Sequence, residues 1–151
     1  MSGGALPPLR RVITGLDGDG RSTILIDGPA TNVIWSTEAT PADNGSNDDA
    51  GGGPFRFPES GSLFVCHDFP PGGGSPIHAT DTIDYIVVVS GEIVFITESG
   101  ETTLRGGDVL VDRGAVHAWR NDGAETCRVI NVLIPAHPLG QGATVRGEVA
   151  M

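Results

Sequence analysis

The chain has 151 residues and a mass of 15.6 kDa, which suits one domain with a single hydrophobic core. Nineteen acidic side chains against nine basic ones give a formal net charge of −10, and the basic residues are scattered along the chain. Without a basic stripe to neutralise phosphates, we expect no nucleic-acid partner. No apolar run approaches the ~18 residues that a membrane helix needs, and the N-terminus lacks a signal-peptide core, so we expect a cytoplasmic protein that does not bind membranes.

Glycine and proline, at 23 and 11 residues, interrupt the chain often and leave little room for long helices. Short segments rich in Val and Ile are separated by turn signals such as Ser90-Gly91 and Ser99-Gly100. This pattern predicts an antiparallel barrel or sandwich, because no stretch keeps the 3.6-residue period of an amphipathic helix. The whole chain, residues 1–151, is therefore predicted to be a single all-β domain.

In chain order, the first predicted element is a β-hairpin over residues 10–28, closed by an Asp-Gly-Asp-Gly turn at residues 17–20. Residues 37–54 have almost nothing to bury, so we expect a mobile loop there that acts as a lid. The tail, residues 137–151, has lost strand patterning and is expected to be extended or disordered. Further strands are predicted at Asn32–Ser36, Gly61–Phe69, Thr82–Ser90, Glu92–Glu98, Asp108–Asp112, His117–Arg120 and Cys127–Ile134.

Two signatures of glycine and histidine lie close together in the second half of the chain. They read Gly72-x5-His78-x-Thr80-x3-Asp84-x6-Gly91 and Gly106-x5-Asp112-x-Gly114-x2-His117-x3-Asn121. In this spacing the chain resembles the cupins over roughly residues 60–136. It is most similar to small single-domain cupins whose motifs read His-x-Thr-x3-Asp and His-Ala-Trp-Arg-Asn. The resemblance implies a jelly-roll barrel, also called a double-stranded β-helix.

Three positions depart from the usual cupin motifs. Thr80 stands where a second histidine is expected, Asp84 where a glutamate is expected, and Asp112 where a proline is expected. In most cupins three histidines and one glutamate hold a metal. The resemblance therefore implies a reduced ligand set in this chain.

Residues of equal parity in a strand face the same side, so Asp84 shares a face with His78, and Trp119 shares one with His117. If the two hairpins pack as they do in cupins, both faces point into the barrel. His78, Asp84 and His117 would then form the minimum set for a three-ligand divalent site, with Fe, Mn, Zn or Ni as candidate metals. The alternative is that both histidines are structural and no metal is bound.

Substrate contacts are predicted at Thr80, Trp119 and Asn131. Trp119 is either an aromatic wall of the pocket or core filler. Asn131 interrupts an apolar strand and belongs either to the pocket or to a barrel edge. His67 is expected at the surface or at an interface, and Asp112 at a turn or rim.

Two residue types are expected to have packing roles only. Tyr85 has the opposite parity to Asp84 and is assigned to inter-sheet or dimer packing. Cys66 and Cys127 stand in apolar runs without Cys-x-x-Cys spacing, so both are predicted to be buried free thiols.

Three functions remain open, all on a small molecule in the barrel mouth. The leading hypothesis is a metal-dependent enzyme with Asp84 and His117 as catalytic residues. Lyase, decarboxylase, isomerase or cyclase chemistry is favoured over a dioxygenase, because only two histidines would support a redox iron. The second hypothesis is a non-catalytic metabolite-binding module, and the third a metal-free acid/base enzyme that uses Asp84 or a histidine. A homodimer is expected through the hairpin at residues 10–28.

Overall fold

The computed structural model describes residues 4–139 and 147–148, and every regular element in them is a β-strand. The all-β prediction is confirmed. Since the described residues hold no helix, they hold none that is long and apolar enough to cross a membrane. The strands are β1 (Arg10–Leu16), β2 (Ser22–Pro29), β3 (Val33–Thr37), β4 (Ser62–Phe69), β5 (Gly74–Ala79), β6 (Thr82–Ser90), β7 (Glu92–Thr97), β8 (Glu101–Arg105), β9 (Val109–Asp112), β10 (His117–Arg120), β11 (Cys127–Pro135) and β12 (Gly147–Glu148).

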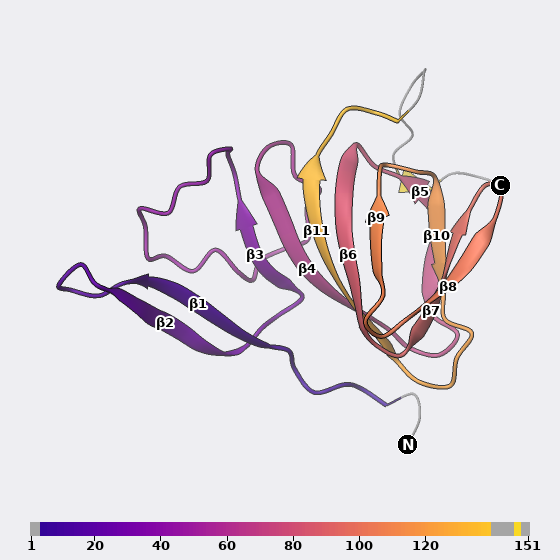
Figure 1. Cartoon of the computed structure of the whole chain (residues 1–151), viewed down its shortest axis with the longest axis horizontal. Helices are drawn as coiled ribbons and strands as arrows, with labels where there is room; N and C mark the ends of the chain where they lie inside the picture. Colours follow the sequence, from indigo (N-terminus) through magenta and orange to yellow (C-terminus); the bar gives the residue numbers. More distant parts are fainter. Residues whose placement is uncertain (1–3, 140–146, 149–151) are drawn as a thin grey trace.

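Two five-stranded sheets form the body of the molecule, in the orders β12-β5-β10-β7-β8 and β3-β4-β11-β6-β9. All pairings between neighbouring strands are antiparallel. The third sheet is the hairpin β1-β2, which projects from the body on the side of β3 (Figure 1). Non-consecutive strands are neighbours in both large sheets, so residues distant in sequence meet in the space between them.

Three strands of the structure were not predicted. β5 contains Gly74 and Pro76, and β8 is mostly polar, so neither shows the apolar alternation of a strand; pairing with β10 and with β7 provides the order instead. β12 lies in the tail that was expected to be extended or disordered, and it pairs with β5. The rest of that tail, residues 140–146 and 149–151, lies outside the described residues.

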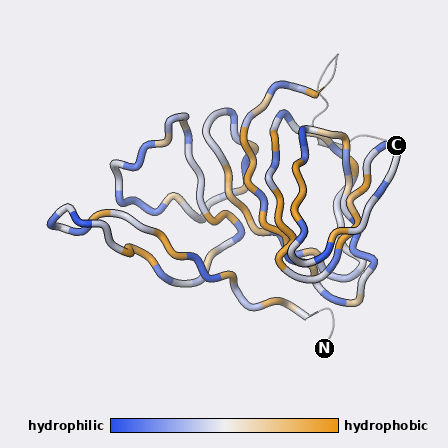
Figure 2. The backbone as a smooth tube through the Cα atoms, in the orientation of Figure 1, coloured by the Kyte–Doolittle hydropathy of each residue, from blue (hydrophilic) through white to orange (hydrophobic). Residues whose placement is uncertain are grey.

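The core lies between the two large sheets and follows the alternation of the strands. In β6, Ile86 and Val88 are buried while Tyr85, Val87 and Val89 point outward. Figure 2 shows hydrophobic segments along the strands of the body and along the hairpin β1-β2. One core cluster contains Ile86, Val88, Ile93, Cys127 and Val129, and a second contains Val33, Leu63, Val65 and Leu133.

The turn between the two sheets requires glycine at position 91. Gly91 has a φ of 78°, and a Cβ there would lie 2.9 Å from the Cα of Cys127. Cys66 and Cys127 are free and buried, as predicted, and burial raises the pKa of the Cys127 thiol to about 11. Both thiols therefore act as small apolar side chains.

After Thr37, the last residue of β3, the segment 37–54 contains no strand, and part of it lies against the N-terminal hairpin. The Asp49 carboxylate pairs with the Arg11 guanidinium, and the Asn47 side chain donates to the Leu16 carbonyl at 2.9 Å. The Gly52 N–H donates to the Val33 carbonyl at 2.8 Å. Its mobility stays a prediction, but these contacts tie its second half to β1 and β3.

Two of the exposed apolar surfaces in the described part of the chain lie on strands. The hairpin exposes Ile24, at 61%, together with Val12 and Leu16. The outer face of β6 and β9 exposes Tyr85, Val87, Val89, Val109 and Val111. A two-stranded hairpin is only marginally stable by itself, so its apolar positions favour burial against a second copy.

We therefore expect a homodimer, with a mass near twice 15.6 kDa in light scattering at micromolar concentration. Ile24→Glu should shift this mass toward the monomer, because it places a charge in the apolar contact. Thr102→Glu, on the exposed edge strand β8, is the matched control and should leave the dimer intact. A monomeric mass for the wild type would contradict the prediction.

Candidate active site in the barrel interior

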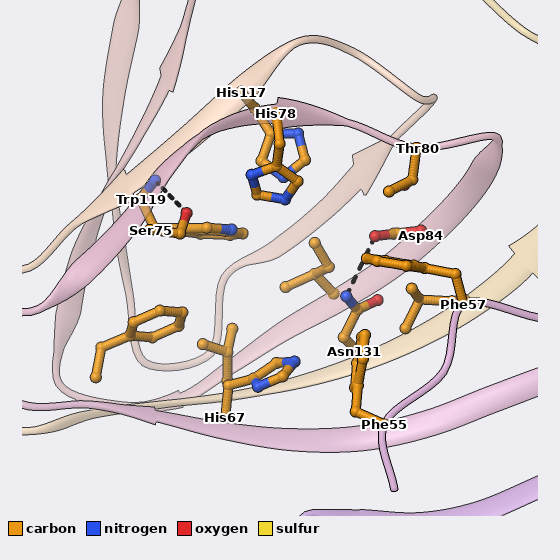
Figure 3. A pocket seen from close by; sticks show the side chains of 14 residues that line it. Phe55, Phe57, His67, Ser75, His78, Thr80, Asp84, His117, Trp119 and Asn131 are labelled. Carbon is orange, nitrogen blue, oxygen red and sulfur yellow. Dashed lines mark hydrogen bonds between the residues drawn. The ribbon is translucent and has the colours of Figure 1, made fainter. Parts of the chain in front are cut away.

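A cavity of about 260 Å³ lies between the two large sheets (Figure 3). Its walls are largely apolar and aromatic, with polar groups gathered from β5, β6, β10 and β11. All six predicted site residues line this one cavity: His78, Thr80, Asp84, His117, Trp119 and Asn131. The lining residues are Phe55, Phe57, His67, Phe69, Ser75, His78, Thr80, Asp84, Ile86, His117, Trp119, Val129, Asn131 and Leu133.

His78 and His117 lie side by side because they are register partners on β5 and β10. Their ring centroids are 4.4 Å apart, and the ring of His117 stacks on Phe95 at 5.2 Å. Each Nδ1 lies 2.8 Å from a backbone carbonyl, that of Pro76 for His78 and that of Ala115 for His117. A carbonyl oxygen only accepts hydrogen bonds, so both Nδ1 atoms carry a hydrogen, and in its neutral form each ring keeps a lone pair on Nε2.

The turn between β9 and β10 fixes the position of His117. Asp112 Oδ1 accepts the Ala115 N–H at 3.0 Å, and Asp112 Oδ2 lies 3.0 Å from His117 Nδ1. Gly114 has a φ of 72°, and a Cβ there would lie 3.1 Å from the Thr80 carbonyl oxygen. The prediction of Asp112 as a turn or rim residue was incomplete: its side chain is buried and orients the catalytic candidate His117.

Asp84 lies in the opposite sheet and is held by a separate set of contacts. Its Oδ1 accepts the Thr82 hydroxyl at 2.7 Å, and its Oδ2 accepts the Asn131 amide at 3.2 Å. Burial raises the pKa of the Asp84 carboxyl, and the Asp112 charge on the neighbouring strand, opposite Asp84 in register, adds to the increase. The two hydrogen bonds and His117 act in the opposite direction.

Asn131 belongs to the pocket and not to a barrel edge, because β11 lies between β4 and β6 in the middle of its sheet. Trp119 contributes to both of the predicted roles: its ring lines the cavity and packs 4.9 Å from Phe95 and 5.9 Å from Phe69. Thr80 lies just after β5, and its hydroxyl is 2.8 Å from that of Thr82.

His67 lines the cavity, which corrects its assignment to the surface or an interface. Its ring lies 5.6 Å from Phe55 and 6.2 Å from Phe69. Burial lowers the pKa of the His67 imidazole and favours the neutral ring. The sequence alone does not say which parity of β4 faces the barrel, so it could not assign His67 to the cavity.

The segment predicted to be a lid does not line the cavity in this structure, so its role as a lid stays a prediction. None of residues 37–54, all of which the structure describes, lines the cavity; Phe55 and Phe57, directly after that segment, cover one side of it. Their rings pack edge to face at 5.1 Å. Two phenylalanines at the end of a polar stretch were the available sequence signal, because such rings need an apolar surface to cover.

The predicted three-ligand metal set does not assemble in this arrangement. The described residues contain no group of three or more His, Cys, Asp and Glu side chains placed to hold a metal ion. His78 and His117 are adjacent, but both oxygens of Asp84 accept hydrogen bonds from Thr82 and Asn131. The donor set present is therefore two imidazoles, fewer than the three protein ligands usual at a catalytic zinc.

The profile of the cupin domain (Cupin_2) matches residues 65–133. The chain is 36% identical to the cupin-domain-containing oxidoreductase srdD of Neurospora crassa, over 85% of this chain and 77% of that protein. The chain belongs to the cupin family. It is also 34% identical to the cupin-domain-containing oxidoreductase fogC of Aspergillus ruber, where the match covers 74% of this chain but only 63% of that protein.

The cupin fold extends to solved structures. The cupin domain of Schizosaccharomyces pombe Cnp3 superposes with a TM-score of 0.54 over 83% of this chain and 87% of that domain, at 14% identity. At this identity the likeness speaks for the fold alone. The predicted double-stranded β-helix, or jelly-roll barrel, is confirmed.

The raised pKa of Asp84 predicts a pH dependence of stability. A carboxyl whose folded pKa exceeds its ordinary value of 3.8 stabilises the folded state below that value, and the contribution is lost as pH rises through the folded pKa. Asp84→Asn cannot titrate, so its free energy of unfolding, relative to the wild type, should increase as the pH rises above 3.8. Urea unfolding of both proteins across this range measures the difference.

Asp27→Asn is the matched control with the opposite sign. The hydrogen bond from Arg10 lowers the pKa of Asp27, so wild-type Asp27 stabilises the folded state above the ordinary value of 3.8. The unfolding free energy of this variant, relative to the wild type, should fall slightly with rising pH. A flat difference for Asp84→Asn would contradict its raised pKa.

Proposed function

We propose that this cupin is an enzyme that moves protons to and from a small, largely apolar organic substrate, with His117 and Asp84 as the proton carriers. The observation that carries the proposal is the pairing, in one aromatic cavity, of an imidazole oriented through its Nδ1–H with a buried carboxyl of raised pKa. Perturbed carboxyls and oriented histidines in a pocket are typical of acid/base sites.

His117 is the better candidate for the base. Its Nδ1–H is directed at the Ala115 carbonyl and lies beside the Asp112 carboxylate, so the ring is held in one tautomer. The free Nε2 lone pair is then available to a substrate proton. Asp112 acts through His117 and is a positioning residue.

Asp84 supplies the second proton position. Because burial favours its neutral form, it would hold a proton at a higher pH than an exposed aspartate. Thr82 and Asn131 fix the plane of the carboxyl on one wall, and the histidine pair lies on another (Figure 3). A substrate between them would lose a proton on one side and gain one on the other, which is the work of an isomerase or lyase.

Proton exchange at carbon tests this proposal without knowledge of the natural substrate. Wild-type protein, freed of metal and kept with a chelator, should accelerate exchange of the α-hydrogens of small aryl ketones for deuterium, followed by NMR in D2O. His117→Ala and Asp84→Asn should each reduce the acceleration by about 10²-fold or more, the usual contribution of a general acid or base. Ser22→Ala, on the remote hairpin, is the control and should match the wild type.

Acceleration that survives both substitutions would overturn the assignment of these residues. No acceleration of any ketone, with all variants folded, would count against proton transfer as the reaction.

A second candidate function is metal-dependent oxidoreductase chemistry, since the two relatives are named oxidoreductases. Both His78 and His117 direct Nδ1–H at backbone carbonyls, an arrangement usual for histidines that bind a metal through the other nitrogen. A divalent metal held there would supply Lewis-acid or redox chemistry. The engagement of Asp84 by Thr82 and Asn131 favours the first candidate.

Thermal unfolding with and without excess chelator separates the two candidates. A metal that binds only the folded state at 100 times its Kd adds about 2.7 kcal/mol, so chelation should then lower the wild-type Tm. His117→Ala would remove this effect, and by itself should cost about 1–3 kcal/mol of stability. His67→Ala removes another ring from the same cavity and should keep the chelator effect. Equal wild-type Tm values, in protein shown by elemental analysis to have lost metal, favour the metal-free enzyme.

A further inference from the structure

The hydrogen bonds around Asp84 run in one direction, because both of its carboxyl oxygens accept. Thr82 donates its only hydroxyl hydrogen to Asp84 Oδ1, at 2.7 Å. In the 2.8 Å contact between Thr80 and Thr82 the hydrogen must therefore come from Thr80. Asn131 is oriented in the same way, because only its Nδ2 can donate to Asp84 Oδ2.

This direction leaves acceptors on the cavity side. The Thr80 hydroxyl has given its hydrogen to Thr82, so its oxygen offers only lone pairs. The Asn131 Oδ1 atom is buried and has no hydrogen-bond partner within the described part of the chain. An acceptor buried in this way destabilises the folded protein unless a partner in the pocket donates a hydrogen bond to it.

The histidine wall presents the same polarity. His78 and His117 donate from Nδ1 to the Pro76 and Ala115 carbonyls, so each neutral ring offers the Nε2 lone pair. Ser75, whose oxygen accepts the Trp119 N–H at 3.3 Å, lies at the Trp119 end, away from Asn131 and Thr80 (Figure 3). One region of the cavity is thus lined by acceptors and calls for a ligand with several donors.

The apolar walls restrict the shape of that ligand. Phe55, Phe57, Phe69 and Trp119 surround the cavity with ring faces and edges, which suit a flat aromatic molecule. The cavity volume of about 260 Å³ exceeds the ~150 Å³ of an apolar cavity that binds benzene. One ring with short substituents fits this volume.

We propose that the substrate is a single-ring aromatic compound with at least two hydroxyl groups, which donate hydrogen bonds to Asn131 Oδ1 and to the acceptors of Thr80, His78 and His117. This inference rests on the proposed function for the cavity being the substrate site, and it adds the substrate class. Hydroxyl hydrogens satisfy the buried acceptors, and the ring fills the aromatic walls.

Calorimetry with matched probes tests the inference. Resorcinol and hydroquinone are compared with their dimethyl ethers, which keep the ring and the oxygens but have no donor. Metal-free protein with a chelator is used, and neither diol can chelate a metal through adjacent oxygens. The diols should bind about tenfold more tightly than the ethers or better, because each ether leaves a buried acceptor unpaired.

Three variants assign the preference to the named atoms. Thr80→Val and Asn131→Leu each remove one acceptor and should reduce the preference for diol over ether several-fold, whereas Thr80→Ser keeps the hydroxyl and should keep the preference. Val129→Ala, which changes an apolar wall, is the matched control and should weaken diol and ether equally.

Equal affinities for diols and ethers, or no binding of either, would overturn the proposal, as would a preference that neither Thr80→Val nor Asn131→Leu changes. The outcome is separable from that of proton exchange. If the protein prefers diols but does not exchange aryl ketones, the proposed ligand class stands and the catalytic roles of His117 and Asp84 fall. If it exchanges aryl ketones but shows no preference for diols, the catalytic roles stand and the proposed ligand class falls.

Discussion

The buried carboxylate of Asp112 is the contact on which the geometry of the site depends. Asp112 lies at the end of β9 and is 4% exposed. One of its oxygens accepts the Ala115 N–H, and the other lies against Nδ1 of His117 on β10, a strand of the other sheet. Through the register of β6 and β9 it also stands opposite Asp84. A single side chain therefore closes the turn that carries His117 and contributes to the raised pKa of Asp84. Burial and the neighbouring Asp112 charge both favour the neutral form of the Asp84 carboxyl.

Inside the barrel, an apolar core lies next to the polar groups that line the cavity. The core below the cavity consists of branched aliphatic side chains from both sheets, with Trp119 and Phe69 packed against it. In the cavity wall, Thr80, Thr82 and Asp84 form one chain of hydrogen bonds, and Asp112 bonds across the turn after β9. The Asn131 Oδ1 atom has no partner in the described residues and is free to accept from a ligand. Since a buried polar atom without a partner is costly, such an atom in a cavity lined by aromatic rings marks the place where binding energy is available.

Membership of the cupin family accounts for the fold and for the position of the cavity, but the chemistry depends on a few substitutions within the motifs. Thr80 stands where most cupins have a histidine ligand, and its hydroxyl donates a hydrogen bond to Thr82. Asp84, which is shorter than the usual glutamate, accepts hydrogen bonds from Thr82 and Asn131 of the same sheet. These changes turn a wall that elsewhere in the family offers metal ligands into a hydrogen-bonded wall. The pair His78 and His117 keeps the orientation in which histidines bind metals, with Nδ1–H directed at a backbone carbonyl.

The turn signals and strand periodicity of the sequence predicted the all-β class, and its resemblance to the cupin motifs implied the jelly-roll barrel and the meeting of His78 with His117. The tertiary structure decided what those signals do not contain. The register of β6 with β9 set Asp112 against Asp84, and the packing of the turn after β9 set Asp112 against His117. His67, Phe55 and Phe57 enter the cavity for the same reason: which parity of β4 faces inward, and where a loop returns to the barrel, depend on contacts with strands far away in the chain. Local pattern carries no information about these contacts, since the energy that selects them is gained only when both sheets are assembled.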